Sequence, residues 1–273
     1  MSVAVTNSAK TPQTFMVQAA NAVTNSNGII TYNQGAAKTA PKHVAFSDLL
    51  PERTKATVTI PAGHTQTVAF TVTTPQTPFN GLVLGAFSVR SLTAAQAAQK
   101  QGGFANLANY VIGVSLTENH AKITPHLTYH GAKYASQNHL PHVAITLANT
   151  QPVIIGTVHL TAKVTDEHGK VVAATEQAGL NFAPSNRFDY HLATKANRAL
   201  AAGKYRLQLK IKADNGQWSF DRHFTVTKNT VKHTKVAHFI NWKHWLWLVI
   251  DGLAVLIIIG FLLNLILRRN KRH

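Results

Sequence analysis

The side chains with the most capacity for chemistry in this chain are its 15 histidines, because it has no cysteine. Histidine can ligate metals or transfer protons near neutral pH. The histidines form neither an HExxH motif nor a pair four residues apart on a plausible helix, so no metal or catalytic site is predicted. We interpret those in the middle of the chain as exposed side chains on a polar face, although two or three could meet in space: His120, His126, His130, His139 and His142.

Exposed histidines would have one modest consequence. Each is neutral at neutral pH and gains a positive charge below about pH 6.5. The chain already carries a formal charge of +17, so acidification would make it still more cationic. We therefore hypothesise that contact with anionic polymers strengthens in acid. Binding that stays unchanged on acidification would remove this hypothesis.

The other groups that enzymes use are sparse. The chain has ten acidic residues, and their spacing suggests no acid/base pair. Asp166 and Glu167 lie in a predicted turn, where a solvated role is the simpler interpretation. There is no Gly-x-Ser-x-Gly elbow and no phosphate-binding glycine loop. Trp218 could stack on a sugar or peptide, but a tryptophan of a β-sandwich core is the preferred reading. A binding protein without metal or cofactor is therefore predicted, rather than an enzyme.

The charge balance indicates which partners to expect. Lys and Arg number 27 against ten Asp and Glu. Such a surface attracts polyanions, among them nucleic acid, anionic lipid head groups and the teichoic acids of a Gram-positive wall. No basic run is interleaved with aromatic residues and no zinc-finger spacing occurs, so nucleic acid is not an expected partner. The absence of cysteine excludes disulfides and thiolate zinc sites.

Residues 245–267 form an apolar segment that predicts a transmembrane helix. At about 1.5 Å per residue it would span roughly 34 Å, enough for a bilayer core of about 30 Å. Tryptophans at the N-terminal end of the segment indicate a membrane–water interface there. A dense basic cluster just after the segment indicates a cytoplasmic C terminus. Asp251 lies about one turn inside and is read as an acid near the interface or a contact with a partner helix. The residues of this predicted anchor are Trp242, Trp245, Trp247, Arg268, Arg269, Lys271 and Arg272.

The two ends of the chain bear on export and anchoring. No LPxTG motif precedes the apolar segment, so we expect the anchor to be retained rather than replaced by a covalent wall linkage. Met1 leads at once into a strand-like run, Ser2 to Val5, and not into a secretory signal. We expect a single-pass protein of the cell membrane whose N-terminal part lies outside.

The elements that precede the anchor are predicted to be strands, because apolar residues alternate with polar ones. In the first part, alternating runs occur at 3–5, 15–19, 58–60 and 68–72, and Asn27-Gly28 predicts a tight hairpin turn. In the second part, they occur at 143–147, 158–164, 205–211 and 218–226, with turns at Asp166–Gly169 and Asp214–Gly216. About seven short strands with frequent turn signals suggest an immunoglobulin-like sandwich.

The predicted organisation is all-β, with two immunoglobulin-like β-sandwich domains followed by one C-terminal transmembrane helix. The first domain comprises 1–92 and the second comprises 104–228. Between them, 93–103 is rich in Ala and Gln and is read as a linker or one short helix. A juxtamembrane segment, 229–244, precedes the helix at 245–267, and 268–273 form a cytoplasmic tail.

Residues 22–32, 78–85, 149–155, 182–188, 203–207 and 218–220 form a series of motifs. Their order along the chain resembles that of the WxL-interacting protein family. Residues 22–32 resemble its A-x-T-N-x-N-G-x-I-x-Y stretch, and 78–85 are similar to the loop and strand that close its first domain. Residues 149–155 resemble its N-x-x-P-x-x-I step and 182–188 its M-A-P-N-S-x-F motif. Residues 203–207 and 218–220 match its closing hairpin. The resemblance covers nearly the whole chain.

The resemblance implies that the first domain binds peptidoglycan and the second binds WxL-domain proteins or host ligands, on a Gram-positive surface. Two substitutions depart from the family pattern: Ala86 stands where a second glycine is usual, and Ser185-Asn186 reverses the expected order. Family members also carry a signal peptide and opening strands before the point that matches Met1. A first domain without those strands should expose apolar edges.

Three functions therefore remain open. The first is a non-enzymatic adaptor that binds WxL-domain proteins and peptidoglycan or anionic wall polymers. The second is an adhesin that binds host matrix proteins directly. The third is a wall-active enzyme, which should release muropeptides from peptidoglycan.

Overall fold

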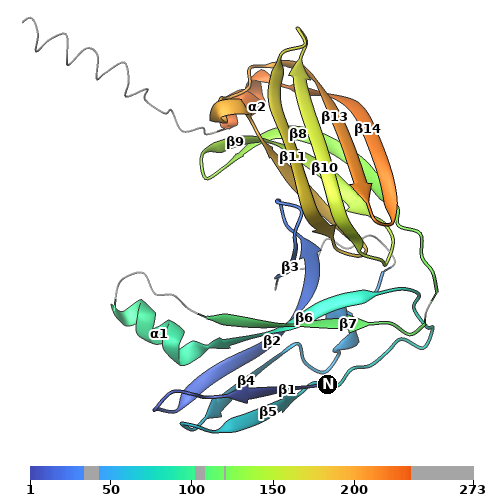
Figure 1. Cartoon of the computed structure of the whole chain (residues 1–273). Helices are drawn as coiled ribbons and strands as arrows, with labels where there is room; N and C mark the ends of the chain where they lie inside the picture. The colour runs from blue at the N-terminus through green and yellow to red at the C-terminus, as the bar shows by residue number, and fades with distance from the viewer. Residues whose placement is uncertain (34–42, 102–107, 120, 235–273) are drawn as a thin grey trace, which may run out of the picture. The chain divides into compact units, whose positions relative to one another are not determined.

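The computed structural model describes residues 1–33, 43–101, 108–119 and 121–234 (Figure 1). The described residues all belong to one compact unit. The described part is all-β except for short helices: α1 (Leu92–Gln101), α2 (Lys228–His233) and two 3-10 turns, η1 (Phe46–Leu49) and η2 (Lys195–Asn197). The strands form four sheets, two in each of two sandwiches.

The first sandwich packs a narrow sheet on a wide one. The narrow sheet pairs β1 (Ser2–Thr6) with β5 (Thr65–Ala69), and both strands run antiparallel. The wide sheet has five strands in the order β3-β2-β6-β7, with β4 also paired to β2. Its strands are β2 (Gln13–Thr24), β3 (Ile30–Asn33), β4 (Lys55–Ile60), β6 (Val83–Ser91) and β7 (Asn109–Leu116).

The segment expected to link two domains instead connects two neighbouring strands of this wide sheet. Of these residues, 93–101 form most of α1, in keeping with their Ala- and Gln-rich composition and its helix propensity. They connect β6 to β7, which pair with each other from Val83↔Leu116 to Arg90↔Asn109. Residues 109–116, assigned from the sequence to the second domain, therefore belong to a sheet of the first sandwich.

Aromatic side chains fill the core of the first sandwich. Phe46 meets Phe87 edge to face at 5.4 Å between ring centroids, and Phe70 lies 4.5 Å from Phe87. Gly85 makes this packing possible, because a Cβ atom there would lie 2.3 Å from the ring of Phe46. Ala86, the next residue, is fully buried.

The second sandwich has two sheets of similar width. One has the order β12-β9-β8 and the other β11-β10-β13-β14. The strands are β8 (Leu127–Gln137), β9 (Leu140–Asn149), β10 (Ile155–Asp166), β11 (Val171–Phe182), β12 (Asn186–Ala193), β13 (Gly203–Ala213) and β14 (Gly216–Val226). All the neighbouring strands pair antiparallel.

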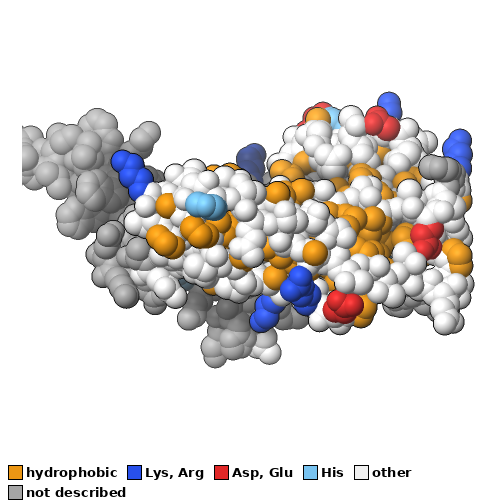
Figure 2. Space-filling model, turned by 90° about the horizontal axis from the view of Figure 1, so that it is seen from below, with side chains coloured by type: hydrophobic (Ala, Val, Ile, Leu, Met, Phe, Trp, Pro, Cys, Tyr) orange, Lys and Arg blue, Asp and Glu red, His pale blue; other side chains and the backbone are white. Residues whose placement is uncertain are grey.

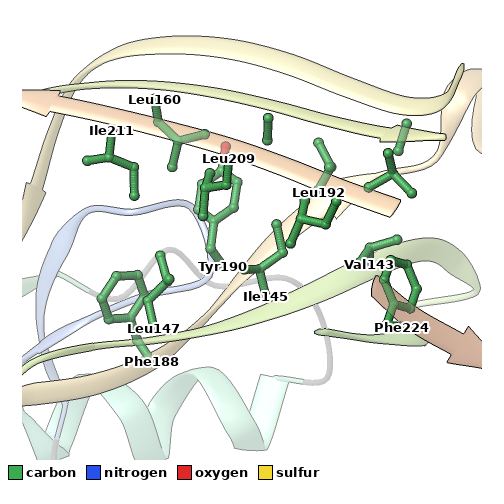
Figure 3. Packing of buried hydrophobic residues seen from close by; sticks show 14 of the residues in the cluster. Val143, Ile145, Leu147, Leu160, Phe188, Tyr190, Leu192, Leu209, Ile211 and Phe224 are labelled. Carbon is green, nitrogen blue, oxygen red and sulfur yellow. The ribbon is translucent and has the colours of Figure 1, made fainter. Parts of the chain in front are cut away.

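Alternation in the sequence explains this core. The inward residues of β10 and β13 that the sequence singled out are all buried: Val158, Leu160, Ala162, Val164, Tyr205, Leu207, Leu209 and Ile211. Figure 3 shows Leu160, Leu209 and Ile211 facing Ile145, Leu147 and Tyr190 across the core. Tyr190 is 2% exposed, and its hydroxyl donates a hydrogen bond to Gln177 Oε1 at 2.8 Å, so its polar end is satisfied.

The predicted turns are confirmed. Gly28 and Gly169 have φ of 75° and 78°, the left-handed backbone that glycine accepts without strain. The carboxylate of Asp166 accepts hydrogen bonds from the backbone N–H groups of His168 and Lys170, which closes the turn between β10 and β11. Asp166 thus has a structural role in a solvated turn, as expected.

Candidate binding surfaces

The histidines are arranged mostly as the sequence suggested, with one correction. His126, His130 and His139 are exposed, and His120 lies outside the described residues. Among the residues that the structure places, no group of three or more His, Asp or Glu side chains could hold a metal ion. The interpretation of His142 as exposed was wrong: it is 7% exposed and stacks on His191, with ring centroids 3.9 Å apart.

The stacked pair is an electrostatic feature of the second sandwich. His142 is on β9 and His191 on β12, and Leu192↔Val143 brings the two strands together. Burial lowers the pKa of both imidazoles, and for His191 the nearby His142 lowers the pKa further. The nearby Asp189 raises the pKa of both imidazoles, and Lys133 lowers it. This pair is therefore held neutral at pH values where exposed histidines become charged.

The predicted membrane anchor lies outside the described residues. This holds for all seven side chains that define it: Trp242, Trp245, Trp247, Arg268, Arg269, Lys271 and Arg272. No helix within residues 1–234, as far as they are described, is long and apolar enough to cross a membrane.

Two motifs that are distant in the sequence meet in space. The tip of the β2–β3 hairpin contacts the β11–β12 connection of the second sandwich. Asn186 Oδ1 accepts a hydrogen bond from the N–H of Thr24 at 2.8 Å, and Thr24 Oγ1 accepts one from the N–H of Ala183 at 2.8 Å. All three residues are buried. We call this contact the clasp.

Backbone hydrogen bonds extend the clasp along the hairpin. The N–H of Asn181 donates to the carbonyl of Gly28 at 3.0 Å, and the N–H of His191 donates to the carbonyl of Ser26 at 2.9 Å. Gly28 also packs closely on Leu180: a Cβ atom there would lie 3.0 Å from Cδ1 of Leu180, closer than an ordinary contact. The Asn-Gly turn and the Asn186 motif, each read separately from the sequence, are therefore parts of one structural contact. Spacing along the chain gives no signal that they are partners.

A hollow of about 510 Å³ lies beside the clasp. Its lining mixes apolar and polar side chains, among them Phe79, Pro152, Asn80, Gln151 and His43. Ser185, at its margin, is buried, has φ of 48°, and its hydroxyl has no hydrogen-bond partner in the described residues. The hollow offers hydrogen bonds and apolar contacts, and none of the described residues that line it is an acid.

A row of cations lies on the outer face of the second sandwich. Four of the five outward positions from Lys204 to Lys212 on β13 carry basic side chains. The fifth is Gln208, which lies opposite Lys163 of β10 on the same face. Two acids share this face, Glu176 and Asp221. The cationic row consists of Lys163, Lys204, Arg206, Lys210 and Lys212, all of which are exposed.

One member of the row is paired. Arg206 makes a bidentate contact with Asp221, at 2.8 Å from Nε to Oδ1 and 2.6 Å from Nη2 to Oδ2. The hydrogen bond from Arg206 holds the pKa of Asp221 below its usual range. The lysines of the row remain available for a polyanion. The alternation of basic residues with the apolar residues from Tyr205 to Ile211 is visible in the sequence. The pairing of β13 with β10 shows that Lys163 lies on the same face as the basic residues of β13.

Trp218 lies at one end of the row. It is half-buried and packs against the core of the second sandwich, as the sequence favoured. It also lines a shallow hollow with Lys210, Lys212 and His159. Its indole therefore contributes to packing and borders the cationic row at the same time.

Comparison with known protein families covers most of the chain. Residues 1–91 match the peptidoglycan binding domain of WxL Interacting Protein, and residues 99–235 match the host binding domain of WxL Interacting Protein. Both are described as binding domains. Among curated protein sequences, none matches the chain.

Solved structures show only distant likenesses. A chaperone–tip adhesin complex of CFA/I fimbriae is 10% identical with a TM-score of 0.33, and the alignment covers 82% of this chain and 90% of that one. The CsuC–CsuE pilus pre-assembly complex of Acinetobacter baumannii is 14% identical with a TM-score of 0.33, covering 81% and 89%. The exo-chitosanase CsxA of Amycolatopsis orientalis is 15% identical with a TM-score of 0.26, covering 81% and 25%.

Proposed function

Because this chain belongs to the WxL-interacting protein family, we propose that it is a membrane-anchored adaptor that binds WxL-domain proteins and cell-wall peptidoglycan on a Gram-positive surface. The observation that carries this proposal is the match of two successive binding-domain families to residues 1–91 and 99–235. Each matched region contains its own β-sandwich core. In this proposal both sandwiches are immunoglobulin-like modules and neither has catalytic chemistry.

The clasp supports an adaptor that works as one body. Asn186 and Thr24 share buried hydrogen bonds between the two sandwiches, so a ligand of one module is held near the other. Two weak sites on one anchored body act together, because binding at the first raises the effective concentration at the second. Moderate affinity at each site is then sufficient at a cell surface.

Binding to the wall can be tested by sedimentation. The full chain, purified in detergent, is incubated with insoluble peptidoglycan sacculi and centrifuged. We expect it to sediment with them and to release no muropeptides. A chain that stays in the supernatant contradicts the wall-binding part, and release of muropeptides would instead support an enzyme.

The cationic row supports a second wall contact, with anionic polymers. Lys210→Gln combined with Lys212→Gln should reduce sedimentation with sacculi that keep their teichoic acids and have no effect once the polymers are removed. Lys10→Gln with Lys55→Gln removes the same charge from exposed positions of the first sandwich and is the matched control. Equal losses in both double variants would show a non-specific charge effect, and salt should weaken any specific one.

Partner binding is tested by capture from surface extracts. The full chain is the correct bait, because a fragment that starts at residue 104 would separate β7 from β6. Recovery of a WxL-motif protein supports the adaptor. Direct binding of the purified chain to collagen or fibronectin, without a bacterial partner, would favour a host adhesin, which the description of the second family as host binding also suggests.

The topology in this proposal places the sandwiches outside the cell, residues 245–267 in the membrane and 268–273 in the cytoplasm. It depends on the tryptophans and basic residues that flank the apolar segment. Protease added to intact cells should digest the N-terminal part and leave a membrane-bound C-terminal fragment. Complete protection of the N-terminal part would contradict the proposed location.

A further inference from the structure

Four segments of the chain lie at the end of the second sandwich from which the chain continues toward the predicted anchor. They are the β8–β9 turn, the β10–β11 turn, the connection that follows β12, and α2. The N–H of Thr194, just after β12, donates to the carbonyl of Pro141 at 3.2 Å, and Thr194 forms a β-bridge with Ala173 of β11. α2 follows β14, which ends where β13 begins, opposite the last residues of β10. We call this end of the second sandwich the exit end.

A hollow of about 540 Å³ lies at the exit end, between the start of β11 and the connection that follows β12. Three cationic side chains line it, those of Lys170, Lys195 and Arg198, and none of the described lining residues is an acid. None of the three cations forms an ion pair within the described residues. The rest of the lining is apolar: Val171, Val172, Ala196, Ala199 and Leu200. The hollow therefore combines unpaired positive charge with apolar carbon.

The two acids of the β10–β11 turn are engaged with other groups. The carboxylate of Asp166 accepts hydrogen bonds from the N–H groups of His168 and Lys170. Glu167 Oε1 lies 3.8 Å from Nε2 of His168. Neither acid lines the hollow. The hollow therefore keeps its positive character and should attract an anionic ligand.

The connection that carries two of these cations has a strained backbone. Ala196 and Asn197, which lie between Lys195 and Arg198, have φ of 54° and 52°, in the left-handed region that residues with a Cβ atom rarely adopt. The N–H of Asn197 donates to the carbonyl of Thr194, and the N–H of Arg198 donates to that of Lys195. Such strain is common where a turn presents side chains to a ligand.

Cations are not gathered in this way on every face of the molecule. On the face in Figure 2, Lys and Arg side chains are few and stand apart, and Asp and Glu side chains lie among them. The net charge of +17 is therefore unevenly distributed over the surface. A cluster of three cations around one hollow is a local feature of the exit end.

The length of the chain keeps the exit end close to the predicted anchor. Ten residues, 235–244, separate Thr234 from the apolar segment that starts at Trp245. A chain of that length reaches at most about 40 Å. Leu140, in the β8–β9 turn of the same end, is 46% exposed, and an apolar side chain so placed is suited to the head-group region of a bilayer.

We propose that the hollow at the exit end binds the head group of an anionic phospholipid and so docks the second sandwich on the membrane surface. The lipid phosphate would lie among Lys170, Lys195 and Arg198, and its glycerol carbons would lie against Val172 and Ala199. A teichoic acid also offers phosphates, but it is polar throughout and leaves the apolar lining unused. The lipid site rests on the proposed function, because it requires the anchor that brings this end to the membrane.

The test uses single cysteines, since the chain has none of its own. Ala199→Cys places a label in the hollow, and Gln217→Cys places one at the opposite end of the sandwich, beside the β13–β14 turn. Each full chain is reconstituted into vesicles, and a membrane-impermeant dye then labels only the chains whose sandwiches face outward. Quenching by a lipid with a nitroxide head group reports contact with the membrane surface.

The lipid composition decides the expected result. In vesicles that contain phosphatidylglycerol, the hollow label at Ala199→Cys should be strongly quenched. In vesicles of phosphatidylcholine alone its quenching should be weak, because the cations then have no anionic head group to bind. The far label at Gln217→Cys should be quenched little in either. Equal quenching of the two labels, or no quenching of the hollow label by anionic vesicles, overturns the proposal.

Charge variants separate binding in the hollow from a general attraction to lipid. Lys195→Gln with Arg198→Gln should remove at least about half of the quenching of the hollow label, and high salt should do the same. Lys210→Gln with Lys212→Gln removes the same charge elsewhere on the second sandwich and should leave the quenching unchanged. Lys195→Arg with Arg198→Lys keeps both charges and should also keep the quenching. Equal losses in the two glutamine double variants overturn the proposal.

Flotation of the vesicles distinguishes the lipid site from the proposed function. A chain that does not float with the vesicles is not membrane-anchored, and the lipid site fails with the anchor. A chain that floats but shows no quenching of the hollow label keeps its anchor and loses the lipid site. If the hollow label responds to added soluble teichoic acid and not to phosphatidylglycerol, the hollow is a wall-polymer site and the lipid proposal is wrong.

Discussion

The two sandwiches differ in how well their layers match. In the second, a sheet of three strands faces one of four, and inward residues such as Ile145, Leu147 and Leu209 are fully buried. In the first, two strands face five, and Tyr110 and Ile112 remain exposed on the inner face. Alternating apolar residues occur in both. The difference shows that closure of a sandwich depends on the width of its cover and not on the pattern of one strand.

The largest expected contrast is between two isoleucines. Ile145→Ala in the closed core should lower the free energy of unfolding by about 2–5 kcal/mol, because it leaves a cavity. Ile112→Ala on β7 should change it by less than about 0.5 kcal/mol, since its side chain is already half exposed. Denaturant titration of the full chain in detergent measures both. Similar losses would mean that β7 is covered.

The clasp gives the next effect. Asn186→Ala should lower the free energy of unfolding by about 1–3 kcal/mol, because it leaves the buried N–H of Thr24 without its acceptor. Asn215→Ala is the control: Asn215 donates to Ile154 O at 2.9 Å from an exposed position. It should cost less than about 0.5 kcal/mol. Equal effects would show that the sandwiches are not coupled through Asn186.

Acid should act mainly on the second sandwich. The pKa values of His142 and His191 are lowered by burial, so the unfolded chain binds protons more readily than the folded one. Stability is fully present above about pH 6.5, the ordinary histidine pKa, and is lost as the pH falls through the lower folded values. His142→Gln should flatten this loss in a series of thermal melts.

The matched control for acid is His139→Gln, because His139 is exposed on the same hairpin. It should leave the pH dependence of the melting temperature unchanged. A melting temperature that does not vary with pH in the unchanged chain would contradict the burial of the stacked pair. Because the stacked pair is buried, the expectation that acid strengthens contact with anionic polymers concerns exposed histidines such as His126 and His130.

The smallest effect should come from an ion pair on the surface. Arg206 and Asp221 are both well exposed, so water and salt screen their attraction. Arg206→Gln should leave the unfolding midpoint of the second sandwich unchanged within error. A clear destabilisation that disappears in high salt would show that the cationic row contributes to folding and not only to binding.

Strands and turns could be predicted where neighbouring residues in the sequence carry the pattern. The alternation in 205–211 and the Asn-Gly turn at Gly28 correspond to strand β13 and the β2–β3 hairpin. β8 and β11 were not identified, because residues such as Gly131 and Gly179 interrupt their alternation. The expected anchor lies outside the described residues and stays a prediction.

Long-range structure could not be read in the same way. Alternation identifies the buried face of a strand but not its partner, and the paired residues of β1 and β5 lie 59 to 67 positions apart in the sequence. For the same reason, β7 was placed with the wrong sandwich and His142 on an exposed face. The clasp depends on such distant contacts.

Hydrogen exchange at single amides of β1, in the full chain without a partner, tests the central difference most directly. We expect rapid exchange at Ser2, Ala4 and Thr6, whose backbone groups point away from β5, and protection at Val3 and Val5, which bond to β5. Equal protection of all five amides would contradict this pattern of pairing.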